Sequence, residues 1–278
     1  MRLKTLLGDY PGTLPLKRGE VVSSKVKLDF ADVKVPHTAF KRVVRDLEFD
    51  LAELAIMTFL LAREHGKPLL LLPVVLTARF QHPYLVYNAA RGPLAPQDLA
   101  GKRIAIRSWS VTTAVWLRDV LEQDCGVKPT TVGWVTFEEP HVAEVRDPPH
   151  AERAPAGKDP LGMLMEGEVD AAVLGGEPPS DPRIKPVFAD PAAAAEAWRA
   201  KHGTIQINHM VVVKESAAEA APEVLRVLAE SKRLAGLAPE VMPVGAQAVA
   251  SALQAAIDCA HRQGLVSRPV VAKSLLAL

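Results

Sequence analysis

The chain has 278 residues, enough to bury a sizeable core in one large domain or in two lobes. Its 33 basic and 32 acidic side chains nearly balance and only 5% of its residues are aromatic, so neither nucleic acid nor an anionic membrane is expected as a partner. The two cysteines lie far apart and do not suggest a disulfide framework. Apolar runs are too short for a membrane span or a signal peptide, so a cytoplasmic protein is expected.

The first third of the chain alternates between apolar strands and helices. Apolar residues recur at helical spacing through residues 40–47, after an entrance at Pro36. Residues 49–55 place Glu53 in an apolar context and fit a loop, a strand or a short helix. The alternation of strand and helix indicates an α/β architecture. The predicted strands of this part lie at residues 3–7, within 21–30 and at 69–75.

The central stretch of the chain carries basic and hydroxyl side chains around one strand-to-helix turn. The short strand 104–106 ends at Arg107, and a Ser/Thr-rich turn then enters a helix near Thr112. Such a helix N-terminus binds anions, because free backbone N–H groups and the helix dipole point out of it. Arg79 and His82 lie upstream. Together these residues suggest a pocket for a small carboxylated molecule.

The second half of the chain continues the same alternation. The helix that begins near Thr112 is expected to end at Gly126 in a left-handed cap. The polar segment 138–160 contains five prolines, which indicates either a lid or a poorly ordered loop. A later strand, 203–213, carries His209. The other predicted elements are strands at 85–87, 131–137 and 169–174 and helices at 160–165, at 191–202, from 222 and at 246–263.

This order of elements predicts two α/β lobes joined by two crossings. One lobe holds residues 1–85 and 207–278, and the other, residues 86–206, is inserted into it. The crossings are the segments 73–87 and 203–213. A ligand is expected in a cleft between the lobes, where hinge closure shields it from water.

Several motifs resemble those of known proteins. Asp98–Ile104 and Gly167–Ala171 have the pattern of the type 2 periplasmic-binding-protein fold in its second lobe. More particular matches, spread from residue 8 to residue 213, resemble the 4,5-dihydroxyphthalate decarboxylase family, which shares this fold. These matching residues are Gly8, Asp9, Tyr10, Thr13, Pro36, Phe40, Arg42, Phe49, Asp50, Glu53, Pro73, Val74, Arg79, Phe80, His82, Thr113, Ala114, Trp116, Arg118, Trp134 and His209.

The chain departs from the family pattern at a few positions. Gly12 stands where the family has an arginine, and His37 stands where it favours an acid. Ala55 and Met57 replace small hydroxyl residues, and residues 205–208 lack a Phe-Pro approach to the histidine. Loss of the arginine implies one fewer carboxylate contact, so the substrate need not be a phthalate.

The resemblance implies a cofactor-independent decarboxylase for a hydroxylated aromatic acid such as 4,5-dihydroxyphthalate. Removing the carboxylate from an electron-rich ring requires a general acid that protonates the ring carbon. His82 is the first choice for this proton donor and His209 the second. Arg79 and Arg107 are expected to hold carboxylates. The further candidate substrate-binding residues are Thr112 and Thr113 as a helix start, Asp9, Tyr10 and Glu53 as polar contacts, and Trp116 as a stacking surface.

Each candidate also has a structural alternative, such as a satisfied core histidine, an interlobe ion pair, an Asx turn or core packing. The sequence shows no metal-ligand spacing and no glycine-rich phosphate motif, so neither a metal nor a cofactor is expected. A second hypothesis is a solute-binding protein for a small carboxylate, without catalysis. The lack of an export signal favours the enzyme, and the departures at Gly12 and His37 favour the binder or an altered substrate.

Overall fold

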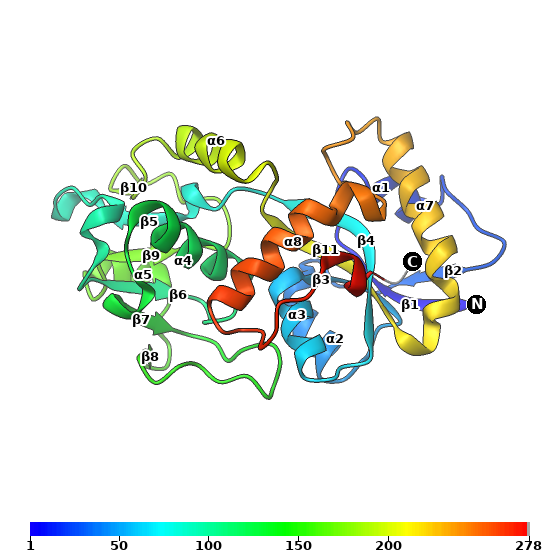
Figure 1. Ribbon diagram of the computed structural model, residues 1–278, viewed down its shortest axis with the longest axis horizontal. Coiled ribbons are helices and arrows are strands. Elements are labelled where there is room, and N and C mark those ends of the chain that lie inside the picture. Colours follow the sequence, from blue (N-terminus) through cyan, green and yellow to red (C-terminus); the bar gives the residue numbers. More distant parts are fainter. Residues whose placement is uncertain (277–278) are drawn as a thin grey trace. The chain divides into compact units, whose positions relative to one another are not determined.

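The computed structural model describes residues 1–276 and consists of two compact α/β units (Figure 1). Unit 1 comprises Met1–Arg79 and the chain from Gln206 onward, and unit 2 comprises Phe80–Ile205. The chain therefore leaves unit 1 once and returns to it once, and each unit has its own sheet.

Unit 1 is built on a five-stranded mixed sheet. Its strands are β1 (Arg2–Leu6), β2 (Lys27–Phe30), β3 (Leu51–Ala55), β4 (Leu69–Ala78) and β11 (Ile207–Lys214), arranged in the order β2-β1-β3-β11-β4. Its helices are α1 (Leu14–Lys17), α2 (Phe40–Val44), α3 (Ile56–Glu64), α7 (Ala221–Leu234) and α8 (Ala246–Arg262). β1 lies parallel to β2 and β3, whereas β11 runs antiparallel to β3 and β4.

Helices pack against this sheet and bury its central strands. α1 and α7 contact each other, and their Leu16 and Val227 join strand residues Leu72 and Val211 in one hydrophobic cluster. α3 and α8 also contact each other, and both contact β4 and β11. All five residues of β3 are buried as a result, including the carboxylate of Glu53.

The apolar composition of β4 is compatible with its place at one edge of the sheet. Its sequence, LLLLPVVLTA, has a proline in the middle. Proline lacks the N–H that a central strand needs for its second neighbour, and an edge strand tolerates this loss. The carbonyl of Pro73 still accepts a hydrogen bond from Gly245 N–H at 2.8 Å, just before α8 begins.

Unit 2 is built on a six-stranded sheet in the order β10-β5-β9-β6-β7-β8. Its strands are β5 (Leu85–Asn88), β6 (Arg103–Ile106), β7 (Gly133–Thr136), β8 (Ala151–Arg153), β9 (Ala171–Val173) and β10 (Ile184–Pro186), and its helices are α4 (Thr112–Cys125), α5 (Pro160–Glu166) and α6 (Pro191–His202). Residues 80–85, which the sequence analysis assigns to the first lobe, belong to this unit, because β5 pairs with β9 and β10 in its sheet.

α4 confirms the helix that the sequence predicts after the Ser/Thr-rich turn. Trp116 on the apolar face of α4 is completely buried, and its ring packs edge-on against Trp198 of α6 at 5.8 Å between ring centroids. The helix ends at Gly126, which has φ +71° and donates its N–H to the carbonyl of Leu121. The left-handed conformation favours glycine here, because a Cβ would approach the backbone too closely.

Other elements differ from their predictions. The helix expected over residues 40–47 stops at Val44. Leu47 adopts a left-handed φ of +48°, so it lies in a turn although it continues the apolar spacing of the helix. The proline-rich segment 138–160, expected to be a lid or a poorly ordered loop, contributes β8, which pairs in parallel with β7. The three residues of β8 lie between the prolines of this segment and so keep the backbone N–H groups that pairing requires.

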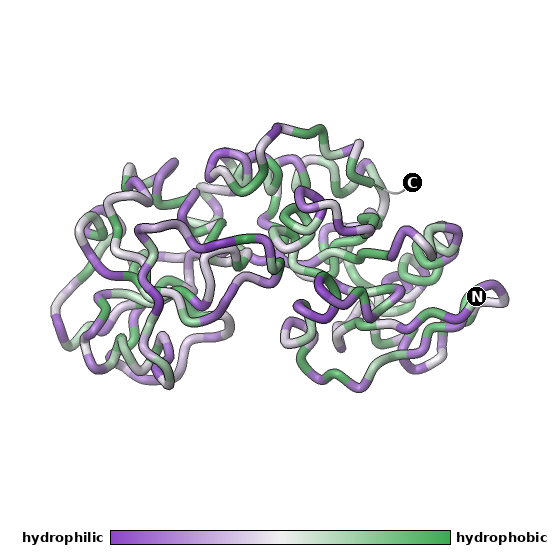
Figure 2. The backbone as a smooth tube through the Cα atoms, turned by 90° about the horizontal axis from the view of Figure 1, so that it is seen from below, coloured by the Kyte–Doolittle hydropathy of each residue, from purple (hydrophilic) through white to green (hydrophobic). Residues whose placement is uncertain are grey.

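The pattern of hydrophobic and hydrophilic residues along the chain fits these packed elements. Hydrophobic and hydrophilic residues alternate along much of the backbone in Figure 2, as expected for helices and strands that bury one side. Within residues 1–276, the helices are too short or too polar to cross a membrane.

The left-handed cap of α4 makes a stability prediction. Gly126→Ala should lower the free energy of unfolding by about 1 kcal/mol, because alanine is strained at positive φ. Urea unfolding followed by circular dichroism measures this. Gly176→Ala is the matched control, since a Cβ meets open space at both glycines but only Gly126 has a left-handed φ. Equal midpoints for the two variants would contradict the assigned role of Gly126.

Candidate active site around Glu53 and His209

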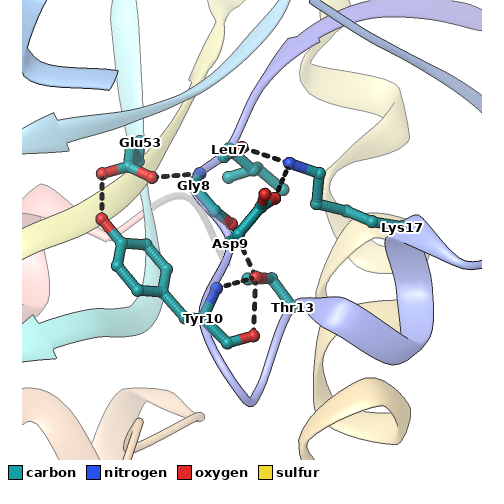
Figure 3. A network of polar contacts seen from close by, with 7 residues as sticks. All are labelled: Leu7, Gly8, Asp9, Tyr10, Thr13, Lys17 and Glu53. Carbon is teal, nitrogen blue, oxygen red and sulfur yellow. Dashed lines mark hydrogen bonds and ion pairs between the residues drawn. The ribbon is translucent and has the colours of Figure 1, made fainter. Parts of the chain in front are cut away.

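The Glu53 carboxylate is the centre of a polar network inside unit 1 (Figure 3). The residue is 0% exposed. Its Oε2 accepts a hydrogen bond from Gly8 N–H at 2.5 Å, and its Oε1 accepts one from the Tyr10 hydroxyl at 2.8 Å. His209 Nδ1 lies 2.9 Å from the same Oε1. A buried carboxylate requires such partners, because the burial of an unpaired charge costs roughly several kcal/mol of folding free energy.

Strand register brings His209 to Glu53. β11 is antiparallel to β3, with His209 opposite Ala55 and Val211 opposite Glu53. Side chains two residues apart on a strand point to the same face, so His209 and Glu53 are diagonal neighbours across the pair. The sequence separation of 156 residues is closed by the antiparallel return of the chain into unit 1.

The turn between β1 and α1 supplies the two other donors to Glu53. Thr13 is fully buried. Its hydroxyl donates a hydrogen bond to the Gly8 carbonyl at 2.7 Å and accepts one from the Tyr10 N–H at 3.0 Å. These bonds fix Gly8 and Tyr10 within one turn. A Cβ on Gly8 would lie 2.7 Å from the Tyr10 ring and 2.9 Å from Glu53 Oε2, so only glycine permits this close approach.

Asp9, in the same turn, points to a different partner. Its side chain is exposed and forms an ion pair with Lys17 of α1. Lys17 Nζ also donates to the Leu7 carbonyl at 3.1 Å (Figure 3). Asp9 thus ties the turn to α1. This contact supports a structural role for Asp9, one of the predicted substrate-binding residues.

The environment of Tyr10 keeps its hydroxyl protonated. Burial, followed by the neighbouring charge and hydrogen bond of Glu53, raises the pKa of the Tyr10 phenol far above its ordinary value. The hydroxyl therefore remains a donor to the carboxylate at all physiological pH values. With both neighbours donating to Glu53, the tautomer assigned to neutral His209 carries its hydrogen on Nδ1, and Nε2 is the ring atom left for a ligand.

His209 is held on its other side by an aromatic ring. Phe40, at the start of α2, meets the imidazole edge-on at 5.1 Å between ring centroids. The side chain of His209 retains 21% exposure. The ring is therefore fixed in orientation, partly accessible, and hydrogen-bonded to a buried carboxylate, as general acid–base catalysis requires.

His82, the first predicted proton donor, has a different environment in unit 2. It begins the short 3₁₀ turn His82–Tyr84, is 1% exposed and packs edge-on against Phe188 at 4.9 Å. Burial lowers the pKa of His82 to about 4. A neutral, inaccessible imidazole is poorly suited to protonate a substrate near pH 7, so the structure favours His209 over His82 for this role.

The remaining predicted residues divide between the units. Arg79 follows β4 in unit 1, and its backbone N–H donates a hydrogen bond to the Gln206 carbonyl at 3.1 Å. Arg107 follows β6 in unit 2, where its Nε lies 3.9 Å from Glu138. Thr112 and Thr113 are the first two residues of α4, where the helix is predicted to begin. Anion binding at this helix start stays a prediction.

The burial of Trp116 bears on its predicted stacking role. Its residue surface is 0% exposed, so no face of the indole is available to a ligand ring. The structure therefore supports its structural alternative, packing in the core of unit 2, where it contacts Trp198. Among residues 1–276, no three His, Cys, Asp or Glu side chains are grouped to hold a metal ion.

Sequence reasoning named Tyr10, Glu53 and His209 but missed the residues that hold them. Gly8, Thr13 and Phe40 appeared only among the residues that match the family pattern, and Phe40 also as part of a predicted helix. The signal was present in the spacing of Gly8, Tyr10 and Thr13, since a glycine and a hydroxyl residue five positions apart fit a tight turn.

Comparison with solved structures identifies the fold. No model of a protein family matches the chain. Two sulfonate-binding proteins named SsuA are similar in structure, one from Xanthomonas axonopodis pv. citri bound to MOPS and one, described as periplasmic, from Escherichia coli. Their TM-scores are 0.57 and 0.58 at 16% and 15% identity, over 99% of this chain and 97% and 91% of theirs. The chain has the periplasmic-binding-protein fold, which confirms the predicted fold class.

Sequence relatives narrow this class to a family. The chain is 30% identical to 4,5-dihydroxyphthalate decarboxylase from Comamonas testosteroni over 235 residues, which are 80% of this chain and 71% of that protein. It is 31% identical to the protein of the same name from Pseudomonas putida over 211 residues, 71% of this chain and 81% of the relative. The chain belongs to the 4,5-dihydroxyphthalate decarboxylase family, and the predicted resemblance is confirmed.

The close approach at Gly8 makes one prediction. Gly8→Ala should lower the free energy of unfolding by about 1–3 kcal/mol, because the added methyl group separates Glu53 from a donor and leaves a buried carboxylate undersatisfied. Nitrogen NMR of the His209 ring should show a changed tautomer balance. Gly133→Ala is the control, since a Cβ there makes only ordinary contacts at 3.4 Å. An unchanged His209 spectrum in Gly8→Ala would refute the network.

The buried imidazole of His82 makes a prediction about acid stability. Its pKa is about 4 in the folded chain against 6.5 as the ordinary value. Between these pH values the unfolded chain binds a proton that the folded chain does not, so the free energy of unfolding falls as pH falls. His82→Gln should make this fall shallower between pH 6.5 and 4, as measured by urea unfolding. His65→Gln, at an exposed position, is the control, and an identical slope in wild type and His82→Gln would contradict the argument.

Proposed function

We propose that the protein is a decarboxylase of hydroxylated aromatic carboxylic acids such as 4,5-dihydroxyphthalate, and that His209 is its proton donor. Membership of the 4,5-dihydroxyphthalate decarboxylase family supports the reaction. The observation that carries the assignment of His209 is its hydrogen bond to the fully buried Glu53 carboxylate, with the imidazole still partly accessible.

The reaction needs one proton at one ring carbon. A hydroxyl para to the departing carboxylate raises the electron density on the carbon that bears it. The His209 imidazolium transfers its Nε2 proton to that carbon. The bond from the ring to the carboxylate then breaks, its electron pair returns to the ring, and carbon dioxide leaves. The imidazole, now neutral, takes a new proton from water, and no oxidant or reductant is consumed.

Glu53 assists by orienting the His209 ring. Its Oε1 lies 2.9 Å from Nδ1, so the imidazole is held with Nε2 as the ring atom left for a substrate. Gly8 and Tyr10 in turn keep Glu53 in place as an acceptor. The proton donor is thus set on rigid strands before substrate arrives, which reduces the reorganisation needed in the transition state.

Arg79 is the proposed carboxylate contact of the same unit. It lies two residues beyond Thr77, which is the register partner of His209 on β4. A guanidinium binds a carboxylate through two parallel hydrogen bonds and so fixes the plane of the ring. The carboxylate-binding roles of Arg107, Thr112 and Thr113 in unit 2 stay predictions.

The direct test is a mass-spectrometric time course of the purified protein with 4,5-dihydroxyphthalate. The expected result is loss of one carboxyl group, seen as the monoacid 3,4-dihydroxybenzoate and carbon dioxide above a protein-free control. Thermal stabilisation by the compound without any turnover would instead support the alternative of a solute-binding protein for small carboxylates. If the compound is neither turned over nor stabilises the protein, it is rejected as the substrate.

A pair of histidine variants tests the proton donor. His209→Asn should reduce kcat by about 10²–10⁴-fold, the usual contribution of a general acid, while the ligand dissociation constant changes only a few-fold. His82→Gln is the matched variant and should keep kcat within about a few-fold of wild type, because the donor remains. The opposite ranking, with turnover lost in His82→Gln and retained in His209→Asn, would overturn the assignment.

A further inference from the structure

Unit 1 contains a hollow that the proposed reaction does not use. Its volume is about 430 Å³, and it is lined by α1, the segment that follows α1, β2 and α7. This volume lies within the range of about 300–1,000 Å³ that is typical of small-molecule pockets. The hollow is therefore large enough for a small organic ligand.

The walls of the hollow are apolar and continuous with the core. Its lining includes buried members of the main hydrophobic cluster of unit 1 and two half-buried residues packed against that cluster. Val22, also part of the lining, is 76% exposed, so apolar surface continues to the rim. An apolar ligand body would remove this surface from water, at a gain of roughly 25 cal/mol per Å². The lining residues that belong to or pack on the cluster are Leu16, Val21, Val26, Leu28, Phe30 and Val227.

The charged groups of the hollow have one sign. Lys17 and Lys27 both line it, and none of the described residues that line it is acidic. An ammonium group has three N–H donors. Lys17 directs its Nζ to the Leu7 carbonyl and to Asp9, which leaves one donor, and the same Nζ lies 5.6 Å from the centre of the Phe30 ring. Lys27 is exposed on the edge strand β2. The hollow thus combines an apolar floor with one lysine that is ion-paired to Asp9 but keeps a further donor, and one exposed lysine.

We propose that this hollow binds a small carboxylic acid with an apolar body, with the carboxylate at Lys17 and Lys27 and the hydrocarbon against the cluster. The charge complementarity selects an anion, and the apolar walls select a ligand without hydroxyl groups on its body. This site is separate from Glu53 and His209. It does not depend on the proposed reaction, since a protein that fails to decarboxylate any acid still carries the hollow.

The test uses octanoate as the probe and the full-length protein. Isothermal titration calorimetry should show saturable binding at one site, tighter for octanoate than for 1-octanol or 1-octylamine, which share its chain but not its charge. Backbone amide shifts in NMR should move at Val21, Val26, Leu28 and Val227. Binding of octanoate no tighter than that of 1-octanol, or amide shifts confined to other parts of the chain, would overturn the proposal.

Lysine variants separate a specific contact from general charge. Lys27→Met should weaken octanoate binding by about two- to fivefold, the usual value of an exposed ion pair, and leave 1-octanol binding unchanged. Lys25→Met removes an equal charge from an exposed residue two positions away that does not line the hollow. It should leave octanoate binding unchanged. Equal losses in Lys27→Met and Lys25→Met would show that the net charge acts, and would reject the assigned carboxylate contact.

Discussion

The burial of one carboxylate constrains much of unit 1. Glu53 is fully buried on a strand whose other four residues are apolar, and an ion in such a place is stable only with hydrogen-bond donors around it. Those donors come from two other parts of the chain, the turn after β1 and the strand β11. Pairing of β3 with both β1 and β11 is therefore a condition for accommodating the charge, and the charge in turn fixes the turn and the imidazole.

The sequence predicted most elements because their signals are local. The apolar face of α4 and the glycine after it lie within fifteen residues, and both the helix and its cap are as predicted. Leu47 shows the limit of the same reasoning, since its spacing continues the helix while its backbone has already turned. Residues 80–85 show another limit, because the unit to which a segment belongs depends on its pairing with β9, which follows about ninety residues later.

The candidate site was predictable as a set of residues but not as an arrangement. Tyr10, Glu53 and His209 were each named, yet their contact depends on the register that places His209 opposite Ala55, which no local pattern encodes. The sequence analysis names His82 as the first choice for proton donor and His209 as the second. Sequence distance carries no information on burial, and burial is what separates the two histidines, one with 1% exposure and one with a partly accessible ring.

The chemistry proposed for this protein rests on side chains rather than on the fold. Solved proteins of the same fold at about 15% identity include binders of sulfonates, so the architecture alone is equally compatible with holding an anion and with transforming one. Binding an aromatic acid requires cations and hydrogen-bond donors. Releasing carbon dioxide from it also requires a proton donor that is accessible and held in position. In the proposed mechanism His209 meets this requirement, because the hydrogen bond to Glu53, the Phe40 ring and the strand register orient an imidazole that is still partly accessible.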